Sequence, residues 1–290
     1  MAETTLIKVN SEHPDVSSVA RAAAVVSQGG LVAFPTETVY GLGADALNPR
    51  AVRRIFRAKD RPADNPLIVH VANLEMLPLL AEQVPPEAEQ LAERFWPGPL
   101  TFVLRRRQGV AEWVSPGLST VAVRMPRNQI ALELIRRSGT PIAAPSANRS
   151  GRPSPTRAQD VMADLSGRID LILDGGPTTV GIESTVLDLT AALPVILRPG
   201  RVTRSDIESV IGPIGQPPSG EELKRSPGTR HRHYSPRAKV VLAENASAAT
   251  LVRLCQSFQE HGKVGFVGCS SLDLIGEPIE QVLLENDPNA

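Results

Sequence analysis

The stretch Phe34-Pro-Thr-Glu-Thr-Val-Tyr-Gly-Leu-Gly43 decides the fold class, because a polar cluster follows directly on an apolar run. Two further stretches have the same layout: Lys59-Asp-Arg-Pro-Ala-Asp-Asn-Pro66 and Ala144-Pro-Ser-Ala-Asn148. In each of them the polar residues lie where the chain turns. In α/β proteins such turns at strand ends face the crevice in which ligands bind. The three stretches therefore predict an α/β fold with one polar site.

Hydrophobic periodicity predicts helices that alternate with short apolar strands. Helices are expected after Asp15, from Asn48-Pro49 to about Lys59, from 128 to 138 with Gly139 at the end, and from 156 to 165 behind a Thr-x-x-Gln capping box. Strands are expected at 31–34, 67–71, 100–104, 120–125, 142–144, 171–173, 185–189 and 195–197. The last three are too close together for helical crossovers, so the sheet should be mixed.

The glycine pair Gly41-x-Gly43 lacks a third glycine at the spacing of a dinucleotide-binding loop. We interpret this pair as turn chemistry. Walker A, His-Glu-x-x-His and serine nucleophile-elbow motifs are also absent from the sequence. Their absence excludes the commonest nucleotidase, metalloprotease and esterase classes.

The sequence changes character after residue 211. Residues 212–236 hold five prolines, four glycines and the basic run Arg230-His-Arg-His233, which indicates a linker over 212–237. Behind it, a strand at 239–242, a helix at about 247–261 and a strand at 263–267 predict a small Rossmann-like domain over 238–290. About 50 residues are few for an independent core. This segment is therefore expected either to be truncated or to be poorly ordered.

Composition limits the possible functions. Lys plus Arg and Asp plus Glu number 31 each, so no global basic field is present to drive non-specific nucleic-acid binding. Cys255 and Cys269 have no Cys or His companions at metal spacing, which favours two reduced thiols over a disulfide framework or a zinc site. The first residues lack a signal-peptide pattern, and no apolar stretch approaches 18 residues. We expect a cytoplasmic protein without a membrane partner.

Several residues are candidates for an anion site. Lys59 and Arg61 place two cations beside one turn, although each could simply complement the dipole at a helix C-terminus. Asn65, Ser146 and Asn148 add neutral hydrogen-bonding groups, so the set could hold a triphosphate. Losing either cation should then be severe, because charge-assisted hydrogen bonds contribute about 1.5–3 kcal/mol each.

Two charged or titratable residues interrupt apolar strands. An arginine that points inward needs an anion, and a substrate carboxylate would satisfy Arg124. His70 could be either a hydrogen-bonded core histidine or a ligand contact. One of Thr36 and Thr38 could be a β-branched strand former, although two threonines in Pro-Thr-Glu-Thr leave some role for both. Tyr234 lies in the linker, which could be a lid over a nucleotide or a solvated tether.

These motifs together resemble the YrdC-like threonylcarbamoyl-AMP synthases. The resemblance spans roughly residues 10 to 236. It also rests on the stretches Trp96-Pro-Gly-Pro-Leu-Thr101, Val121-Ala-Val-Arg-Met-Pro126, Asp174-Gly-Gly, Glu183-Ser-Thr and Leu197-Arg-Pro-Gly200. It implies a twisted mixed-sheet YrdC-like domain flanked by helices over residues 1–211, in the long form that carries a second domain.

The resemblance also implies residue roles. Lys59, Arg61, Ser146 and Asn148 would form the nucleotide-phosphate signature and are the expected catalytic set. The L-threonine site would comprise Thr36, Thr38, His70, Arg124, Ala144 and Ser184. ATP would contact the signature residues together with Asn65, Thr120, Ser154, Arg198 and Tyr234.

The implied reaction joins L-threonine, bicarbonate or carbon dioxide, and ATP into threonylcarbamoyl-AMP and pyrophosphate. Mg²⁺ would be held mainly through phosphates, since no carboxylate cage is visible. The product would pass to a second enzyme that modifies tRNA, whereas direct tRNA binding is left open. Two alternatives remain: a non-catalytic module that binds double-stranded RNA or a nucleotide, and an enzyme that uses a related carbamoyl-adenylate with another acceptor.

Overall fold

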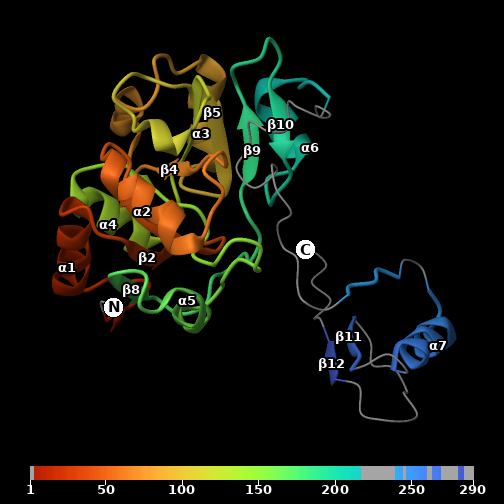
Figure 1. Ribbon diagram of the computed structural model, residues 1–290. Coiled ribbons are helices and arrows are strands. Elements are labelled where there is room, and N and C mark those ends of the chain that lie inside the picture. Colours follow the sequence, from red (N-terminus) through yellow and green to blue (C-terminus); the bar gives the residue numbers. More distant parts are fainter. Residues whose placement is uncertain (1–2, 217–238, 244–245, 260–262, 269–279, 284–290) are drawn as a thin grey trace. The chain divides into compact units, whose positions relative to one another are not determined.

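The computed structural model describes residues 3–216, 239–243, 246–259, 263–268 and 280–283 (Figure 1). The chain divides into a large unit, Met1–Ser235, and a small unit, Pro236–Ala290. Most of the predicted linker, including Tyr234, lies outside the described residues. The predicted domain limits and the lid therefore remain predictions.

A ten-stranded sheet with the order β1-β8-β2-β3-β7-β4-β6-β5-β9-β10 forms the centre of the large unit. Its strands are β1 Thr5–Lys8, β2 Val32–Pro35, β3 Tyr40–Asp45, β4 Ile68–His70, β5 Leu100–Arg105, β6 Thr120–Arg124, β7 Ile142–Ala143, β8 Leu171–Asp174, β9 Thr185–Asp188 and β10 Val195–Arg198. Parallel pairs, such as β4 with β6, occur beside antiparallel pairs, such as β2 with β3 and β5 with β6. The expectation of a mixed sheet is confirmed.

The described large unit also contains six α-helices and two short 3₁₀ helices; the last of them, α6, follows the final strand, β10. They are α1 Val16–Ser27, α2 Pro49–Lys59, η1 Leu74–Leu79, α3 Pro86–Phe95, η2 Glu112–Val114, α4 Gln129–Ser138, α5 Ala158–Leu165 and α6 Arg204–Ile211. Helix α1 packs on α4, and both contact β2, whereas α2 contacts β3 and α3 contacts α6 (Figure 1).

Helix ends follow the predicted capping signals in three of four cases. Asp15 caps α1 by accepting a hydrogen bond from the Ser18 N–H, and Asn48 caps α2 ahead of a proline. Helix α4 ends at Gly139 in the left-handed conformation. The predicted capping box of the fourth helix is wrong: α5 begins after Arg157 without a side-chain cap, and the Thr156 carbonyl instead accepts the Thr178 N–H.

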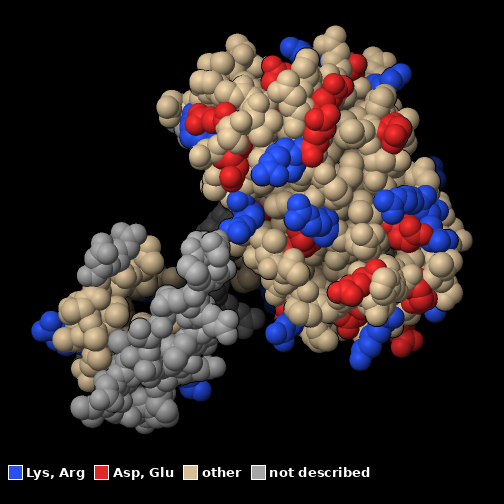
Figure 2. All heavy atoms as spheres, turned by 180° about the vertical axis from the view of Figure 1, so that it is seen from behind, with Lys and Arg blue, Asp and Glu red and all other residues tan. Residues whose placement is uncertain are grey.

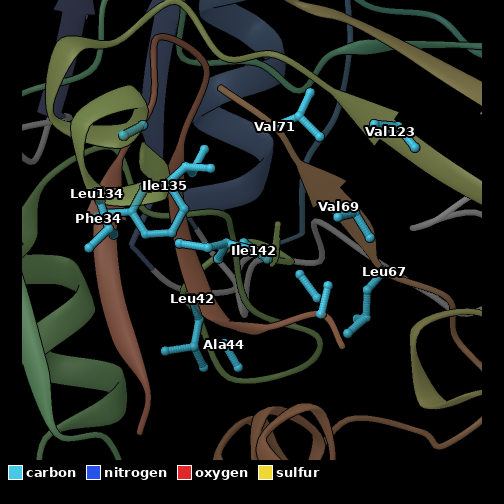
Figure 3. Close-up of a cluster of buried hydrophobic side chains, with 14 of the residues drawn as sticks. Phe34, Leu42, Ala44, Leu67, Val69, Val71, Val123, Leu134, Ile135 and Ile142 are labelled. Atoms are coloured by element: carbon cyan, nitrogen blue, oxygen red, sulfur yellow. The ribbon is translucent and has the colours of Figure 1, made fainter. Parts of the chain in front are cut away.

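Side chains from β2, β3, β7 and α4 meet in the core of the large unit (Figure 3). Phe34, Leu42, Leu134 and Ile142 are fully buried there. Burying a side chain of this size contributes roughly 1.5–3 kcal/mol. This packing holds the sheet region whose strand ends carry the polar clusters.

The prediction that Gly41-x-Gly43 forms a turn is wrong, because both glycines lie inside strand β3. The reason is close packing. A Cβ atom on Gly43 would lie 2.7 Å from both Phe34 Cε1 and Ile142 Cγ2, and one on Gly41 would lie 3.3 Å from the Ala144 Cβ. Glycine therefore marks a place where neighbouring side chains cross the strand closely.

The small unit contains helix α7 Ala248–Gln259 and a parallel pair of strands, β11 Gly265–Gly268 and β12 Glu280–Leu283. The predicted strand at 239–242 is not formed, because no described strand pairs with it. Among the described residues, no helix is long and apolar enough to cross a membrane.

Candidate functional site

The polar strand ends of the large unit line one pocket, with an open space of about 570 Å³ up to its mouth. It brings together nine of the predicted site residues: Thr36, Thr38, Arg61, His70, Arg124, Ala144, Ser146, Ser184 and Arg198. Its wall also contains residues that the sequence analysis did not assign to a binding site: Val39, Gly41, Pro66, Leu67, Ile68, Pro145 and Glu183. A concave site with apolar walls and several convergent polar groups is the usual form of a small-molecule site.

The other predicted residues do not line this pocket. Lys59, Asn65 and Asn148 are buried behind its wall, and Thr120 is half-buried at the start of β6. Ser154 lines a second hollow together with Arg152 and Asp160. Its hydroxyl nevertheless donates to Glu183 Oε1 of the main pocket at 2.6 Å, so it lies beside the pocket wall.

The turn between β2 and β3 uses its two threonines differently. The Thr36 hydroxyl donates to the Val39 carbonyl at 2.7 Å and accepts the N–H groups of Thr38 and Val39. It thereby closes the turn. The two hydroxyls lie 2.9 Å apart, and the Thr38 hydroxyl also accepts a hydrogen bond from Arg124 Nη1 at 3.0 Å. Thr38 is therefore the threonine that connects the turn with the charged part of the pocket.

Arg124 at the end of β6 is almost completely buried, and its anion comes from the chain itself. Arg124 Nη2 lies 2.7 Å from Glu37 Oε2, and the two side chains are only 4% and 5% exposed. The sequence argument that an inward arginine needs an anion is correct, but it overlooked Glu37. The available signal was the carboxylate between two threonines in Pro-Thr-Glu-Thr.

His70 lies at the end of β4, edge-on to Phe34, and is 3% exposed. Burial, together with the nearby charge of Arg124, lowers the pKa of His70 to about 3. The imidazole is therefore neutral near pH 7. Its Nδ1 atom has no hydrogen-bond partner among the described residues, although the ring lines the pocket. A buried polar atom of this kind is available to a ligand.

The phosphate-signature residues are assembled around Lys59. The Lys59 ammonium donates to the main-chain carbonyls of Ser146 and Asn148, and the Lys59 carbonyl accepts the Ser150 N–H at 2.9 Å. Burial and the neighbouring charge of Arg61 hold the pKa of Lys59 well below its usual value. In this arrangement Lys59 fixes the loop that presents Ser146 to the pocket.

Arg61 lies on the pocket side of the same assembly. Its Nε donates to the Asn65 carbonyl at 3.2 Å and its Nη2 to the Pro66 carbonyl at 2.8 Å. These bonds fix the guanidinium on the turn after α2, and Arg61 itself lines the pocket. A fixed guanidinium suits recognition of planar or tetrahedral anions.

A third group comes from β9 and β10. The Ser184 hydroxyl lies 2.7 Å from the Thr101 hydroxyl, and the Arg198 guanidinium donates to the Ser184 carbonyl through Nε and Nη2. Ser184 and Arg198 both line the pocket. The pocket lining therefore includes three guanidinium groups, those of Arg61, Arg124 and Arg198.

Charge on the surface is mixed, in contrast to the pocket. On the face drawn in Figure 2, acidic and basic side chains of the large unit lie close to one another. Within the described part of the chain, no group of three or more His, Cys, Asp or Glu side chains is placed to hold a metal ion.

The fold and the pocket define a mixed α/β domain that presents arginine and hydroxyl groups to a small anionic ligand. Residues 24–200 match the Sua5_yciO_yrdC family, described as "Telomere recombination", and residues 202–287 match Sua5_C, described as "Threonylcarbamoyl-AMP synthase, C-terminal domain". The chain belongs to the Sua5/YrdC family, in the form that carries the Sua5 C-terminal domain.

Curated relatives agree with this assignment. Threonylcarbamoyl-AMP synthase of Pyrococcus abyssi is 50% identical over 274 residues, which cover 90% of this chain and 81% of the relative. Threonylcarbamoyl-AMP synthase of Bacillus subtilis is 50% identical over 249 residues, which cover 84% and 72%.

Solved structures show the same fold. The crystal structure of P. abyssi Sua5 complexed with L-threonine is similar with a TM-score of 0.92 and 48% identity, covering 99% of this chain and 85% of the other. The crystal structure of Escherichia coli YciO is similar with a TM-score of 0.61 and 26% identity, over 69% of this chain and 97% of the other.

Proposed function

We propose that this chain is an L-threonylcarbamoyladenylate synthase, a nucleotidyltransferase that acts on L-threonine, bicarbonate or carbon dioxide, and ATP. One observation carries the proposal. Arg124, His70 and Ser184, which are expected to bind the amino acid, line the same pocket as Arg61 and Ser146, which are expected to bind phosphate. The names of the relatives and the L-threonine complex of P. abyssi Sua5 support it.

The proposed reaction proceeds without a covalent enzyme intermediate. The threonine amine adds to carbon dioxide and gives a carbamate, with loss of a proton. A carbamate oxygen then attacks the α-phosphate of ATP, and the bond to the β-phosphate oxygen breaks to release pyrophosphate. Positioning and charge neutralisation can supply most of the rate acceleration in such transfers.

We assign the roles by charge and position. Arg124 binds the threonine carboxylate, while Thr38, His70 and Ser184 orient the rest of the amino acid. Neutral His70 can form a hydrogen bond with the substrate without adding charge to the pocket. The main-chain groups of Ala144 complete this half.

Arg61 and Ser146 face the nucleotide phosphates, supported from behind by Lys59, Asn65 and Asn148. Arg198 lines the pocket and Ser154 contacts its wall through Glu183, and we assign both to ATP on the family resemblance. We place Thr120 and Tyr234 in the ATP site only on the family resemblance.

Magnesium enters this proposal through the substrate. Among the residues that line the main pocket, Glu183 is the one carboxylate, and it already accepts a hydrogen bond from Ser154. Mg²⁺ usually keeps several waters and binds through substrate phosphates with few protein carboxylates. The few carboxylates in the pocket fit a Mg²⁺ ion that is carried by ATP. The ion would neutralise phosphate charge there.

The product gives the enzyme its place in the cell. We propose that threonylcarbamoyl-AMP passes to a downstream tRNA-modifying enzyme in the cytoplasm. The zero net charge of the chain argues against the alternative of an RNA-binding module, because RNA readers usually carry an excess of basic residues.

Pyrophosphate release tests the function. The purified chain is incubated with ATP, Mg²⁺ and bicarbonate, with and without L-threonine, beside Arg124→Ala and Lys59→Ala. We expect release that depends on L-threonine and is lost in both variants. Release with another amino acid but not with L-threonine would favour the alternative acceptor. No release from folded protein that still binds ATP would contradict the synthase.

A further inference from the structure

Glu37 lies behind the wall of the pocket, and the reaction proposed above gives it no role. It is 5% exposed and does not line the pocket, whereas its sequence neighbour Thr38 and its ion-pair partner Arg124 do. Its Oε2 accepts the Arg127 N–H at 3.0 Å, and its carbonyl accepts the Val180 N–H at 2.8 Å. Glu37 is therefore held in place both at its side-chain carboxylate and at its main chain.

Three contacts set the plane of the Arg124 guanidinium. Its Nε donates to the Gly98 carbonyl at 3.1 Å, its Nη1 donates to the Thr38 hydroxyl at 3.0 Å, and its Nη2 lies 2.7 Å from Glu37 Oε2. Two of these contacts come from the turn that holds Glu37 and Thr38, and the third comes from Gly98, far from that turn in the sequence. A guanidinium held from three sides loses little freedom when it binds a ligand.

The Glu37–Arg124 pair is an incomplete one, and this is informative. In a bidentate pair both carboxylate oxygens would face the guanidinium fork. Here Glu37 Oε1 has no hydrogen-bond partner among the described residues. Arg124 Nη2 lies close to the charged Glu37 Oε2, but the geometry between these two atoms is not that of a hydrogen bond. Arginine carries five N–H groups. Glu37 therefore attracts Arg124 without occupying its whole fork.

We propose that Glu37 is a positioning residue, which holds Arg124 so that its unused N–H groups face the pocket and bind the substrate carboxylate. This inference rests on the proposed function. Glu37 touches no substrate atom and acts through Arg124. The arrangement selects ligands that carry a carboxylate at this point, because a neutral group would leave the unused N–H groups of Arg124 unpaired.

The test is a double-mutant cycle read by L-threonine binding. Calorimetry measures L-threonine affinity for the wild type, Glu37→Gln, Arg124→Lys and the double variant, with thermal unfolding of each. Glutamine keeps the size of the side chain and removes its charge. We expect Glu37→Gln to weaken L-threonine at least tenfold and to leave ATP binding unchanged. In the Arg124→Lys background the same change should have little further effect, because the positioned group is gone.

Glu133→Gln is the matched control, since Glu133 pairs with Arg137 on the surface of α4. It should change neither ligand. Glu37→Asp provides a second variant if Glu37→Gln does not fold, and it should weaken L-threonine to a smaller extent because the charge is retained.

The outcomes separate this inference from the proposed function. Equal or tighter L-threonine binding by folded Glu37→Gln, or an equal loss in both backgrounds of the cycle, would overturn the positioning role alone. Absence of L-threonine binding by the wild type would instead overturn the proposed function. In steady-state assays a positioning role raises KM for L-threonine more than it lowers kcat, whereas a general structural defect would change KM for ATP as well.

Discussion

At the scale of single residues, burial decides what each polar group of the pocket can contribute. His70 and Arg124 end neighbouring strands, yet burial keeps His70 neutral, whereas the guanidinium of Arg124 is paired with Glu37. Desolvation disfavours the charged imidazole, and the adjacent guanidinium disfavours it further. A neutral hydrogen-bonding group beside a fixed cation can orient a zwitterion without competing for its carboxylate.

His70 should make stability depend on pH. Its pKa is 6.5 in the unfolded chain and about 3 in the folded chain, so the unfolded state binds more protons between these values. Stability is then fully present above pH 6.5 and is lost as the pH falls toward 3. The slope from one such group reaches about 1.4 kcal/mol per pH unit. We expect His70→Asn to have a shallower slope between pH 6.5 and 4 in urea titrations.

His13 offers the control for this measurement, because it is an exposed histidine of the same unit. His13→Asn should keep the wild-type slope. If His70→Asn shows the same slope as the wild type, burial does not keep His70 neutral, and its assigned role as an uncharged contact is wrong.

Much of the site could be predicted from residue types at strand ends, because a buried charge or hydroxyl among apolar neighbours needs a reason. Arg124 was singled out in this way, whereas His70 and Thr38 were assigned to the site by the family resemblance. Glu37 was missed because its partner is 87 positions along the chain, and pairing at that distance depends on the sheet order. Lys59 was predicted to meet phosphate directly, whereas its backbone contacts show that it also organises the Ser146–Asn148 loop.

At the scale of elements, helix α2 connects the fold with the site, because it begins at a cap and ends at Lys59. The cap and the terminal residues were visible in the sequence as local signals. Strand β3 could not be predicted from local signals. Its Gly43 makes room for the side chains of Phe34 and Ile142 on neighbouring strands, and this contact is set by tertiary packing. Local sequence signals predict helix ends well. Where close tertiary packing decides the conformation, as in β3, these signals fail.

The cap of α2 gives a test at this scale. The Asn48 side chain accepts the N–H groups of Arg50 and Ala51, and Asn48→Ala should lower the free energy of unfolding by about 1 kcal/mol. Asn73→Ala is the matched control, because Asn73 occupies the N-cap of η1 without a side-chain hydrogen bond. Urea denaturation compares the two. An equal effect of both substitutions would show that the Asn48 hydrogen bonds add nothing to stability.

At the scale of the whole molecule, the large unit does not end where its last helix ends. The sequence predicts a domain that ends at residue 211 and a linker that begins at residue 212. However, Ile214 is buried in the core, the Gly215 N–H donates to the Pro194 carbonyl at 2.8 Å, and Arg204 Nη1 donates to the Gly215 carbonyl at 3.0 Å. Residues 212–216 therefore belong to the packed unit, although their proline and glycine content is typical of a linker.

Two shortened chains separate packing from the predicted lid. Residues 1–216 keep Ile214 in place, and we expect this chain to be about 2 kcal/mol more stable to urea than residues 1–211, since a buried isoleucine contributes roughly 1.5–3 kcal/mol.

Residues 1–216 lack Tyr234, so we expect weaker ATP binding than in the full chain but unchanged L-threonine binding, measured by calorimetry. ATP binding equal to that of the full chain would contradict the lid, because the nucleotide would then be held by the pocket alone. Loss of L-threonine binding in the same folded chain would show instead that residues beyond 216 also complete the amino-acid half of the site.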